Sequence, residues 1–405
     1  MSKGEKFRLT ERQKKFLPFV SLGAFFEGFD FMIISIVLPY VTRDYAITDE
    51  IAAYALSVVS LGTLLAFFLV RLADKIGRRP VFIYSVILYS ALTGLTALAP
   101  NVYAFVILQL IARIFLIATW AVGYIIVSEE FETELRGRAV ALFQSLAAVG
   151  AIFPSVFLLI FALTPLHWRG LYLVGAIPLF IIPFGVKRIF ETQRFLEIKS
   201  GKVKEEAPSL FEVFRKEYRR NIAVVMALWF LSYICYVGAI YFFAQRVVRE
   251  LGWSEAMVGT TTAVAFAVGL LGYAFVGKLL DTIGRKRTAY ITFLSGSMAT
   301  IATFQATEPI VIAILVIIAT FFLGPFTVVC GTITNELFPT HIRGNAMAWG
   351  NNIVGRLGQI FAPALVGLLL RPVGNIGNAV SVLAIGPIIA AVVVALLVPE
   401  TFGKE

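Results

Sequence analysis

Long apolar stretches alternate with short polar ones along the whole chain. Each apolar stretch holds about 20 residues, the length that an α-helix needs to cross about 30 Å of hydrocarbon. The approximate bounds of these stretches are 16–40, 51–70, 80–99, 102–128, 137–164, 168–190, 221–245, 256–280, 286–306, 308–334, 344–370 and 375–398. The pattern predicts an all-α membrane protein with twelve transmembrane helices.

The most polar segment of the chain, residues 191–220, separates the first six stretches from the last six. Its charged residues include Lys199, Lys202, Lys204, Glu205 and Glu206. We therefore expect an N-terminal six-helix bundle over residues 1–190, a cytoplasmic linker over 191–220 and a C-terminal six-helix bundle over 221–405.

A set of charged residues occurs twice, at an offset of 207 residues. Asp74, Arg78, Glu129 and Arg136 in the first half correspond to Asp281, Arg285, Glu336 and Arg343 in the second. Each half also closes on a glutamate, Glu191 and Glu400. A repeat of this length indicates two equivalent bundles rather than a solenoid, and duplicated membrane bundles are typical of secondary transporters.

Composition and charge agree with a membrane location. Hydrophobic residues make up 59% of the 405 positions and charged residues only 15%, which is far from the usage of soluble proteins. Of the 35 Lys and Arg residues, 28 fall in the termini and the even-numbered loops, whereas five fall in the odd-numbered loops. Because cytoplasmic loops retain positive charge, we expect an inner-membrane protein with both termini in the cytoplasm. Anionic lipid headgroups then account for the net charge of +10, and no nucleic-acid partner is expected.

Several kinds of chemistry have no supporting residues. Cys235 and Cys330 both lie in predicted spans, without a CxxC pair or a nearby pair of histidines, so we expect buried thiols rather than a disulfide or a metal site. The phosphate-binding pattern G-x-x-x-x-G-K-[ST] does not occur, and no catalytic set is visible. The sequence thus predicts neither an enzyme nor a cofactor, and any uphill transport has to use an ion gradient.

The repeated charged turn resembles the signature G-x-x-x-D-[RK]-x-G-R-[RK] of the major facilitator superfamily. The leading glycine is present in the second half as Gly277, whereas Val70 replaces it in the first half. The resemblance covers the whole chain and implies a site at the midplane that is exposed alternately to the two sides of the membrane. It also implies that the eight repeated charged residues are gating residues that latch the outward-open state. The alternative is that these charges only anchor the spans at the membrane surface.

Within that superfamily, Glu27-Gly28-Phe29-Asp30 resembles the [DE]-G-[FY]-D pattern of aromatic-acid/proton symporters and their organic-ion transporter relatives. Ser232 to Tyr236 and Arg356 to Pro363 resemble the same group. The Gln-Gln signature of sugar porters is missing from the seventh span, which makes a sugar substrate less favoured.

Four charged residues lie near the middle of predicted spans: Glu27, Asp30, Arg113 and Arg356. A charge at the bilayer centre costs at least about 2.5–3.5 kcal/mol, so these side chains should face one another or a wet cavity. Glu27 and Asp30 are three residues apart and share one helix face, where their repulsion lets one of them hold a proton near neutral pH. Arg113 is the natural counter-ion.

Related sugar/proton symporters pair the matching aspartate and arginine when the aspartate is ionised, and separate them on protonation. By that resemblance, Asp30 carries the proton, Arg113 is its partner, and Glu27 shares the proton or tunes the pair. Two alternatives remain: a static ion pair that fastens two helices, and a role in substrate contact alone.

Arg356 has no evident acidic partner at its depth in the second half, and a bound carboxylate would satisfy it through two hydrogen bonds. The organic-ion transporter group implies an anion here, because its anion-carrying members tend to have arginine at this position. Alternatively, Arg356 bonds to backbone carbonyls or pairs with Glu27. Side chains placed to stack on a substrate ring or to orient its polar groups are Tyr233, Tyr236, Tyr241, Trp120, Gln144 and Asn352.

Together these features predict a monomeric, proton-coupled symporter of a small organic anion, such as an aromatic or heterocyclic carboxylate. Its partners would be that anion, protons and membrane lipid. A sugar or polyol symporter, an exporter of amphiphilic cations that uses Glu27 and Asp30, and a receptor that senses its ligand without moving it are the alternatives.

Overall fold

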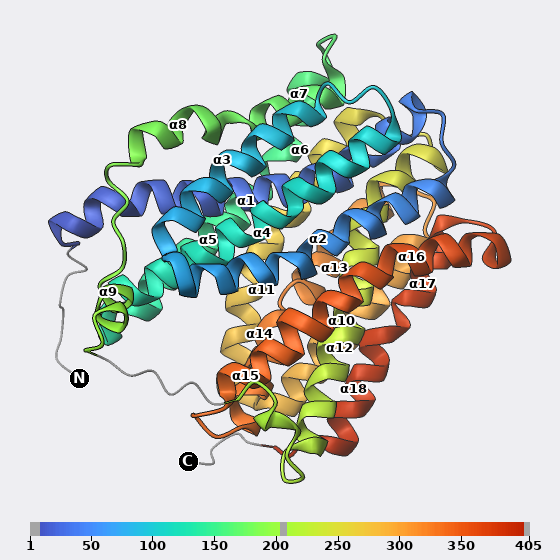
Figure 1. Cartoon of the computed structure of the whole chain (residues 1–405). Coiled ribbons are helices and arrows are strands. Elements are labelled where there is room, and N and C mark those ends of the chain that lie inside the picture. Colours follow the sequence, from blue (N-terminus) through green and yellow to red (C-terminus); the bar gives the residue numbers. More distant parts are fainter. Residues whose placement is uncertain (1–8, 203–208, 401–405) are drawn as a thin grey trace.

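A computed structural model describes residues 9–202 and 209–400, and these residues fold into helices and connecting turns without a β-strand. Figure 1 shows the chain as two groups of helices, blue to green for the first half and yellow to red for the second. Residues 203–208 of the expected linker, which include Lys204, Glu205 and Glu206, lie outside the described residues.

The first half, called the N half below, contains eight helical segments. Their bounds are α1 (Glu11–Asp44), α2 (Asp49–Ile76), α3 (Arg78–Thr96), α4 (Val102–Glu130), α5 (Thr133–Gly150), α6 (Phe153–Phe161), α7 (His167–Gly175) and α8 (Ile177–Gly185). The pairs α5–α6 and α7–α8 each form one predicted span. In both pairs the second segment carries a proline in its first turn, Pro154 and Pro178, where the missing N–H interrupts the hydrogen-bond ladder.

Between the halves lie the short helix α9 (Gln193–Lys199) and the 3-10 turn η1 (Glu212–Phe214). The second half, called the C half, continues with α10 (Arg219–Arg249), α11 (Glu255–Ile283), α12 (Arg285–Gln305), α13 (Pro309–Leu323), α14 (Phe326–Leu337), α15 (Arg343–Met347), the π-helix η2 (Ala348–Gly355), α16 (Arg356–Val373), α17 (Ile376–Leu383) and α18 (Ile385–Leu397).

Each of the twelve predicted spans coincides with one helix or with a run of consecutive helical segments. Ten of them are long and apolar enough to cross a membrane on those grounds alone. The other two, α3 and α12, have 19 and 21 residues but carry several hydroxyl side chains. The prediction of a twelve-span, all-α membrane fold in two six-span halves is therefore confirmed.

The halves touch along three helix pairs: α2 packs on α16, α1 on α10, and α6 on α11. In Figure 1 the halves approach each other at the upper right, where α2 and α16 run together, and diverge toward the side where α1 begins at Glu11 and α18 ends at Leu397. We call that side the terminus-bearing side. The side where α1 ends at Asp44 and α2 begins at Asp49 is called the opposite side.

Polar contacts join the halves toward the opposite side. Asp49 of α2 accepts a hydrogen bond of 2.5 Å from Gln245 of α10 and lies 3.5 Å from Arg249. Glu50 forms an ion pair of 3.1 Å with Arg371 of α16. Among the described residues, the hydrogen bonds and ion pairs between the two halves all lie nearer to this side, so the structure is closed there.

Candidate functional site

The candidate site is built around α1, which passes between the halves and packs on α4, α5 and α7 on one side and on α10 on the other. Side chains from different faces of this one helix therefore reach different halves. Glu27 is half-buried and lies within electrostatic range of both Arg356 and Arg113. Glu27 is thus near Arg356, the partner that one alternative of the sequence analysis gave it, although no ion pair joins the two among the described residues.

Asp30, one turn further along α1, lies inside the N half. Its side chain is only 6% exposed, and its Oδ2 atom accepts a hydrogen bond of 2.8 Å from the hydroxyl of Thr93 in α3. Its other oxygen, Oδ1, has no hydrogen-bond partner in the described part of the chain. Asp30 is therefore held by a neutral hydroxyl in this conformation.

Arg113 of α4 is within electrostatic range of Asp30, but no ion pair joins them among the described residues. Its guanidinium lies 5.1 Å from the ring centre of Phe31, and its Nη1 atom is buried without a partner in the same part of the chain. The structure thus brings Asp30 and Arg113 near each other but keeps the two groups out of contact.

Arg356 begins α16, directly after the π-helix η2. Its Nη1 atom donates a hydrogen bond of 2.9 Å to Oε1 of Gln359, and its guanidinium lies 5.9 Å from the ring centre of Tyr233 in α10. A Cβ atom on Gly355 would lie 3.0 Å from that ring, so glycine at this position lets α10 come close. π segments inside α-helices are frequent at functional sites, and no pattern in the sequence signals this one.

Three of the predicted tyrosines lie at or near the contact between the halves. Tyr233 donates a hydrogen bond of 3.0 Å to Asn351, and both Tyr233 and Tyr236 are within electrostatic range of Glu27. The ring of Tyr241 lies 6.1 Å from that of Phe31, across the boundary between α10 and α1.

The other predicted contact residues, Trp120, Gln144 and Asn352, make none of the described contacts with Glu27, Arg356 or these tyrosines. Trp120 pairs with Tyr124 of its own helix at 6.0 Å, and Gln144 and Asn352 are exposed. Within the described residues, no hydrogen bond, ion pair or ring contact joins these three to Glu27 or Arg356. The amide that does contact one of these tyrosines is Asn351, which accepts from Tyr233.

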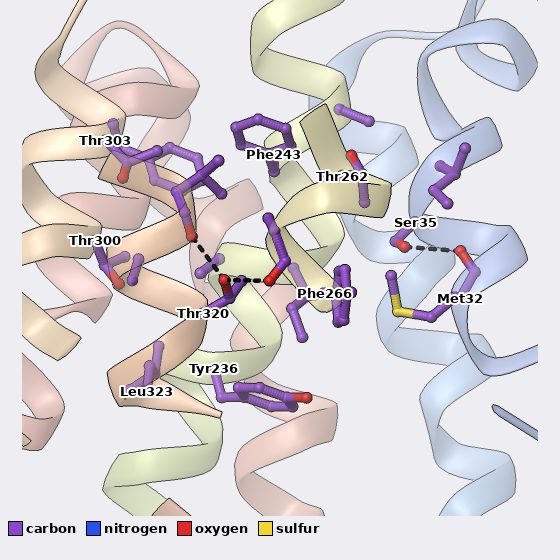
Figure 2. A pocket seen from close by; sticks show the side chains of 18 residues that line it. Met32, Ser35, Tyr236, Phe243, Thr262, Phe266, Thr300, Thr303, Thr320 and Leu323 are labelled. Carbon is purple, nitrogen blue, oxygen red and sulfur yellow. Dashed lines mark hydrogen bonds between the residues drawn. The ribbon is translucent and has the colours of Figure 1, made fainter. Parts of the chain in front are cut away.

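An apolar cavity lies beyond Tyr236, between α1, α10, α11, α12 and α13 (Figure 2). No charged side chain is among its lining residues, which include Tyr236, Phe243 and Phe266. Four of its five Ser and Thr hydroxyls donate hydrogen bonds to main-chain carbonyls; these belong to Ser35, Thr300, Thr303 and Thr320. The cavity therefore suits an uncharged group, while the charges of Glu27 and Arg356 lie outside its wall.

The repeated charged residues come together within each half. In the N half, Arg78 lies 3.2 Å from both Asp74 and Glu129. In the C half, Arg285 lies 2.6 Å from Glu336 and within electrostatic range of Asp281. Arg136 and Arg343, the last pair of the repeat, also make equivalent contacts. Arg136 donates to the carbonyl of Phe131 at 3.3 Å, and Arg343 donates to the carbonyl of Phe338 at 2.9 Å.

The two glutamates that close the halves have a structural role that the sequence analysis did not assign. Glu191 accepts hydrogen bonds from the backbone N–H groups of Arg78 and Arg79 at the start of α3, the shortest at 2.9 Å. Glu400 accepts in the same way from Arg285 and Lys286 at the start of α12, at 3.0 and 3.1 Å. The repetition of these glutamates near the same offset was the signal that pointed to them.

A glycine precedes each of these helix starts and turns the chain in the left-handed region. The φ angles are 111° at Gly77 and 93° at Gly284, which side chains with a Cβ atom adopt rarely. The glycine therefore sets the helix start, and the glutamate carboxylate satisfies the N–H groups that a helix start leaves without partners.

Comparison with known proteins gives matches over nearly the whole chain. Residues 20–248 and 230–405 match the family model described as Major Facilitator Superfamily. The niacin transporter of Acinetobacter baylyi is 24% identical over 95% of this chain and 93% of its own length. The cis,cis-muconate transport protein of the same organism is 28% identical over 94% of this chain and 93% of its own length. The crystal structure of a D-xylose-proton symporter superposes with a TM-score of 0.75 at 19% identity, over 97% of this chain and all of that one.

Proposed function

Because the chain belongs to the major facilitator superfamily of membrane transporters, we propose that it moves a small organic anion together with protons, by alternating access. The substrate class is an aromatic or heterocyclic carboxylate. The observation that carries this proposal is the position of Arg356, which lies midway along a span with only a neutral amide as its hydrogen-bond partner in the described part of the chain.

A carboxylate would bind Arg356 through two charge-assisted hydrogen bonds, a geometry that the planar guanidinium favours over the Gln359 contact. Tyr233 and Tyr236 lie on the same side of α10 one turn apart, so they offer ring faces beside that carboxylate. Niacin and cis,cis-muconate, after which two of the relatives are named, are both organic acids that are anions at neutral pH.

Proton coupling would use Asp30, with Arg113 as its partner in the ionised state. Glu27 lies within electrostatic range of both Arg113 and Arg356, so it would connect the proton site to the substrate site. The excess of Lys and Arg in the loops of the terminus-bearing side supports placing that side in the cytoplasm. The conformation that is closed at the opposite side would then be inward-facing.

Arg356→Gln tests the substrate assignment. The protein is reconstituted in proteoliposomes, and uptake of labelled benzoate, nicotinate, shikimate, xylose and tetraethylammonium is followed with an inward proton gradient, with and without protonophore. We expect accumulation of an acid that collapses with the protonophore, and a KM raised about tenfold or more by Arg356→Gln, because one charge-assisted contact is lost. Arg287→Gln, at an exposed position, is the matched control.

Uptake of xylose or tetraethylammonium without any acid would contradict the anion assignment. If an acid is transported and Arg356→Gln leaves its KM unchanged, the assignment of Arg356 as the carboxylate-binding residue is contradicted, while the substrate class stands. Transport of an acid that ignores the protonophore would contradict proton coupling and leave the substrate class standing.

A further inference from the structure

The carboxyl group of Asp30 lies in a small polar site inside the N half, away from the boundary between the halves. Thr93 of α3 donates its hydroxyl to Oδ2, and Gly175 of α7 faces Oδ1. A Cβ atom on Gly175 would lie 2.5 Å from Oδ1 and 2.6 Å from the methyl carbon of Thr93. Any larger residue in place of glycine would therefore push against both the carboxyl group and the threonine.

Two phenols complete this polar site. Tyr89 of α3 and Tyr172 of α7 are each within electrostatic range of Asp30, and their hydroxyls are buried with no hydrogen-bond partner in the described part of the chain. The titratable and charged groups that face Asp30 are therefore these two tyrosines, Glu27 on its own helix and Arg113 on α4. The direct hydrogen-bond donor to the carboxyl group is Thr93.

The guanidinium of Arg113 is directed toward Phe31 instead of Asp30. Its side chain starts against Gly62 of α2, where an added Cβ atom would lie 2.8 Å from the Cβ of Arg113, and its guanidinium covers the ring of Phe31. Phe31 follows Asp30 in α1, so the two residues point about 100° apart around the helix axis. Its ring also touches Tyr241 of the C half. Asp30 and Arg113 thus lie near enough to meet, yet each is oriented by a different neighbour.

We propose that Thr93 is a positioning residue for proton coupling, and that Asp30 exchanges its contact with Thr93 for one with Arg113 during the transport cycle. The inference rests on the proposed function. A protonated, neutral carboxyl group can accept a hydrogen bond from the Thr93 hydroxyl through one oxygen. It gains little free energy from a nearby cation, because it carries no charge. When the O–H bond of Asp30 breaks and the proton passes to water, the resulting carboxylate gains most from a charge-assisted bond with Arg113. A hydroxyl donor also stabilises a carboxylate, but less than a guanidinium does. Thr93 therefore positions Asp30 while Asp30 carries the proton, and Arg113 replaces Thr93 as the partner once the proton has left.

Thr93→Val removes the donor and keeps the side-chain shape, while Thr93→Ser keeps the donor. Both are compared in proteoliposomes by two measurements: proton-driven accumulation of the transported acid, and its counterflow exchange without a gradient. We expect Thr93→Val to lower accumulation about tenfold, because one hydrogen bond to an ionisable group is lost, and to leave counterflow within about twofold of the unmodified protein. Thr93→Ser should restore accumulation.

Three further variants serve as reference, control and substitute. Asp30→Asn, which has no proton to release, sets the uncoupled reference, with counterflow retained and accumulation lost. Thr119→Val removes another buried hydroxyl of the N half, one that donates to the carbonyl of Phe115 in its own helix, and should change neither measurement. Thr93→Ala is a second variant without a donor, for use where Thr93→Val does not reconstitute.

Equal accumulation by Thr93→Val and the unmodified protein would overturn the inference, while an uncoupled Asp30→Asn would leave the proposed function in place. A parallel loss of accumulation and counterflow would mean that Thr93 only supports the fold, and would overturn it as well. If the unmodified protein shows no accumulation that depends on the proton gradient, the proposed function fails and the inference fails with it.

Discussion

At the scale of single residues, Thr262 of α11 carries the one Ser or Thr hydroxyl lining the apolar cavity that has no partner among the described residues. Its side chain is 6% exposed, so its oxygen has lost its solvation without gaining a hydrogen bond. A buried hydroxyl in this state costs free energy that an isosteric methyl group does not. We therefore expect Thr262→Val to raise the free energy of unfolding by about 1 kcal/mol, measured by thermal unfolding in detergent micelles.

Thr300→Val is the matched control for that variant. The hydroxyl of Thr300 lines the same cavity but donates to the carbonyl of Gly296 at 2.8 Å, so its removal should leave stability unchanged or lower it. Equal stabilisation by both substitutions would mean that apolar character alone matters, and would contradict the assignment of a specific cost to Thr262.

At the scale of elements, the starts of α3 and α12 depend on a carboxylate from a distant part of the chain. Glu191 reaches the first N–H groups of α3 across more than a hundred residues, and it adds a negative charge at a helix N-terminus. We expect Glu191→Ala to lower the free energy of unfolding by about 1 kcal/mol, as loss of a helix cap does elsewhere.

Exposed Glu197, in the nearby helix α9, provides the control for this effect. Glu197→Ala should change stability little, whereas Glu400→Ala should act like Glu191→Ala because it caps α12 in the same geometry. The measurement is again thermal unfolding in detergent. A loss with Glu197→Ala as large as that with Glu191→Ala would point to general charge effects instead of capping.

At the scale of the whole molecule, alternating access requires the contacts of the opposite side to separate in each cycle. A Cβ atom on Gly367 of α16 would lie 3.2 Å from the Cβ of Ala53 in α2, close to the spacing of a disulfide. The double variant Ala53→Cys and Gly367→Cys should therefore form a cross-link on oxidation, lose nearly all transport, and regain it on reduction.

Uptake into proteoliposomes, with cross-linking followed by gel mobility after cleavage between the halves, checks this prediction. Each single-cysteine variant serves as a control. The native cysteines should not interfere, because Cys235 and Cys330 are both buried and unpaired. Full cross-linking with unimpaired transport would mean that the opposite side stays closed throughout the cycle.

The sequence by itself determined the twelve spans, the division into two halves and the residues that repeat between them. Hydrophobic stretches set the spans because a membrane helix has to shield its backbone polar groups within its own length. The repeated pairs around Arg78 and Arg285 were also readable from their spacing, since equivalent positions in duplicated halves have equivalent neighbours. The charges at Glu27, Asp30, Arg113 and Arg356 stood out because their cost in a bilayer demands a reason.

The tertiary structure alone decided which side chains those four charged groups contact. The pairing of Asp30 with Thr93 depends on how α1, α3 and α7 pack, and threonine is too common in membrane spans to be recognised as a partner from sequence. The contact of Asn351 with Tyr233 lies in the π-helix before Arg356, a local geometry that the hydrophobic pattern does not reveal. The closed side is likewise a property of how the halves meet, since the same sequence has to form both closed and open contacts in the course of transport.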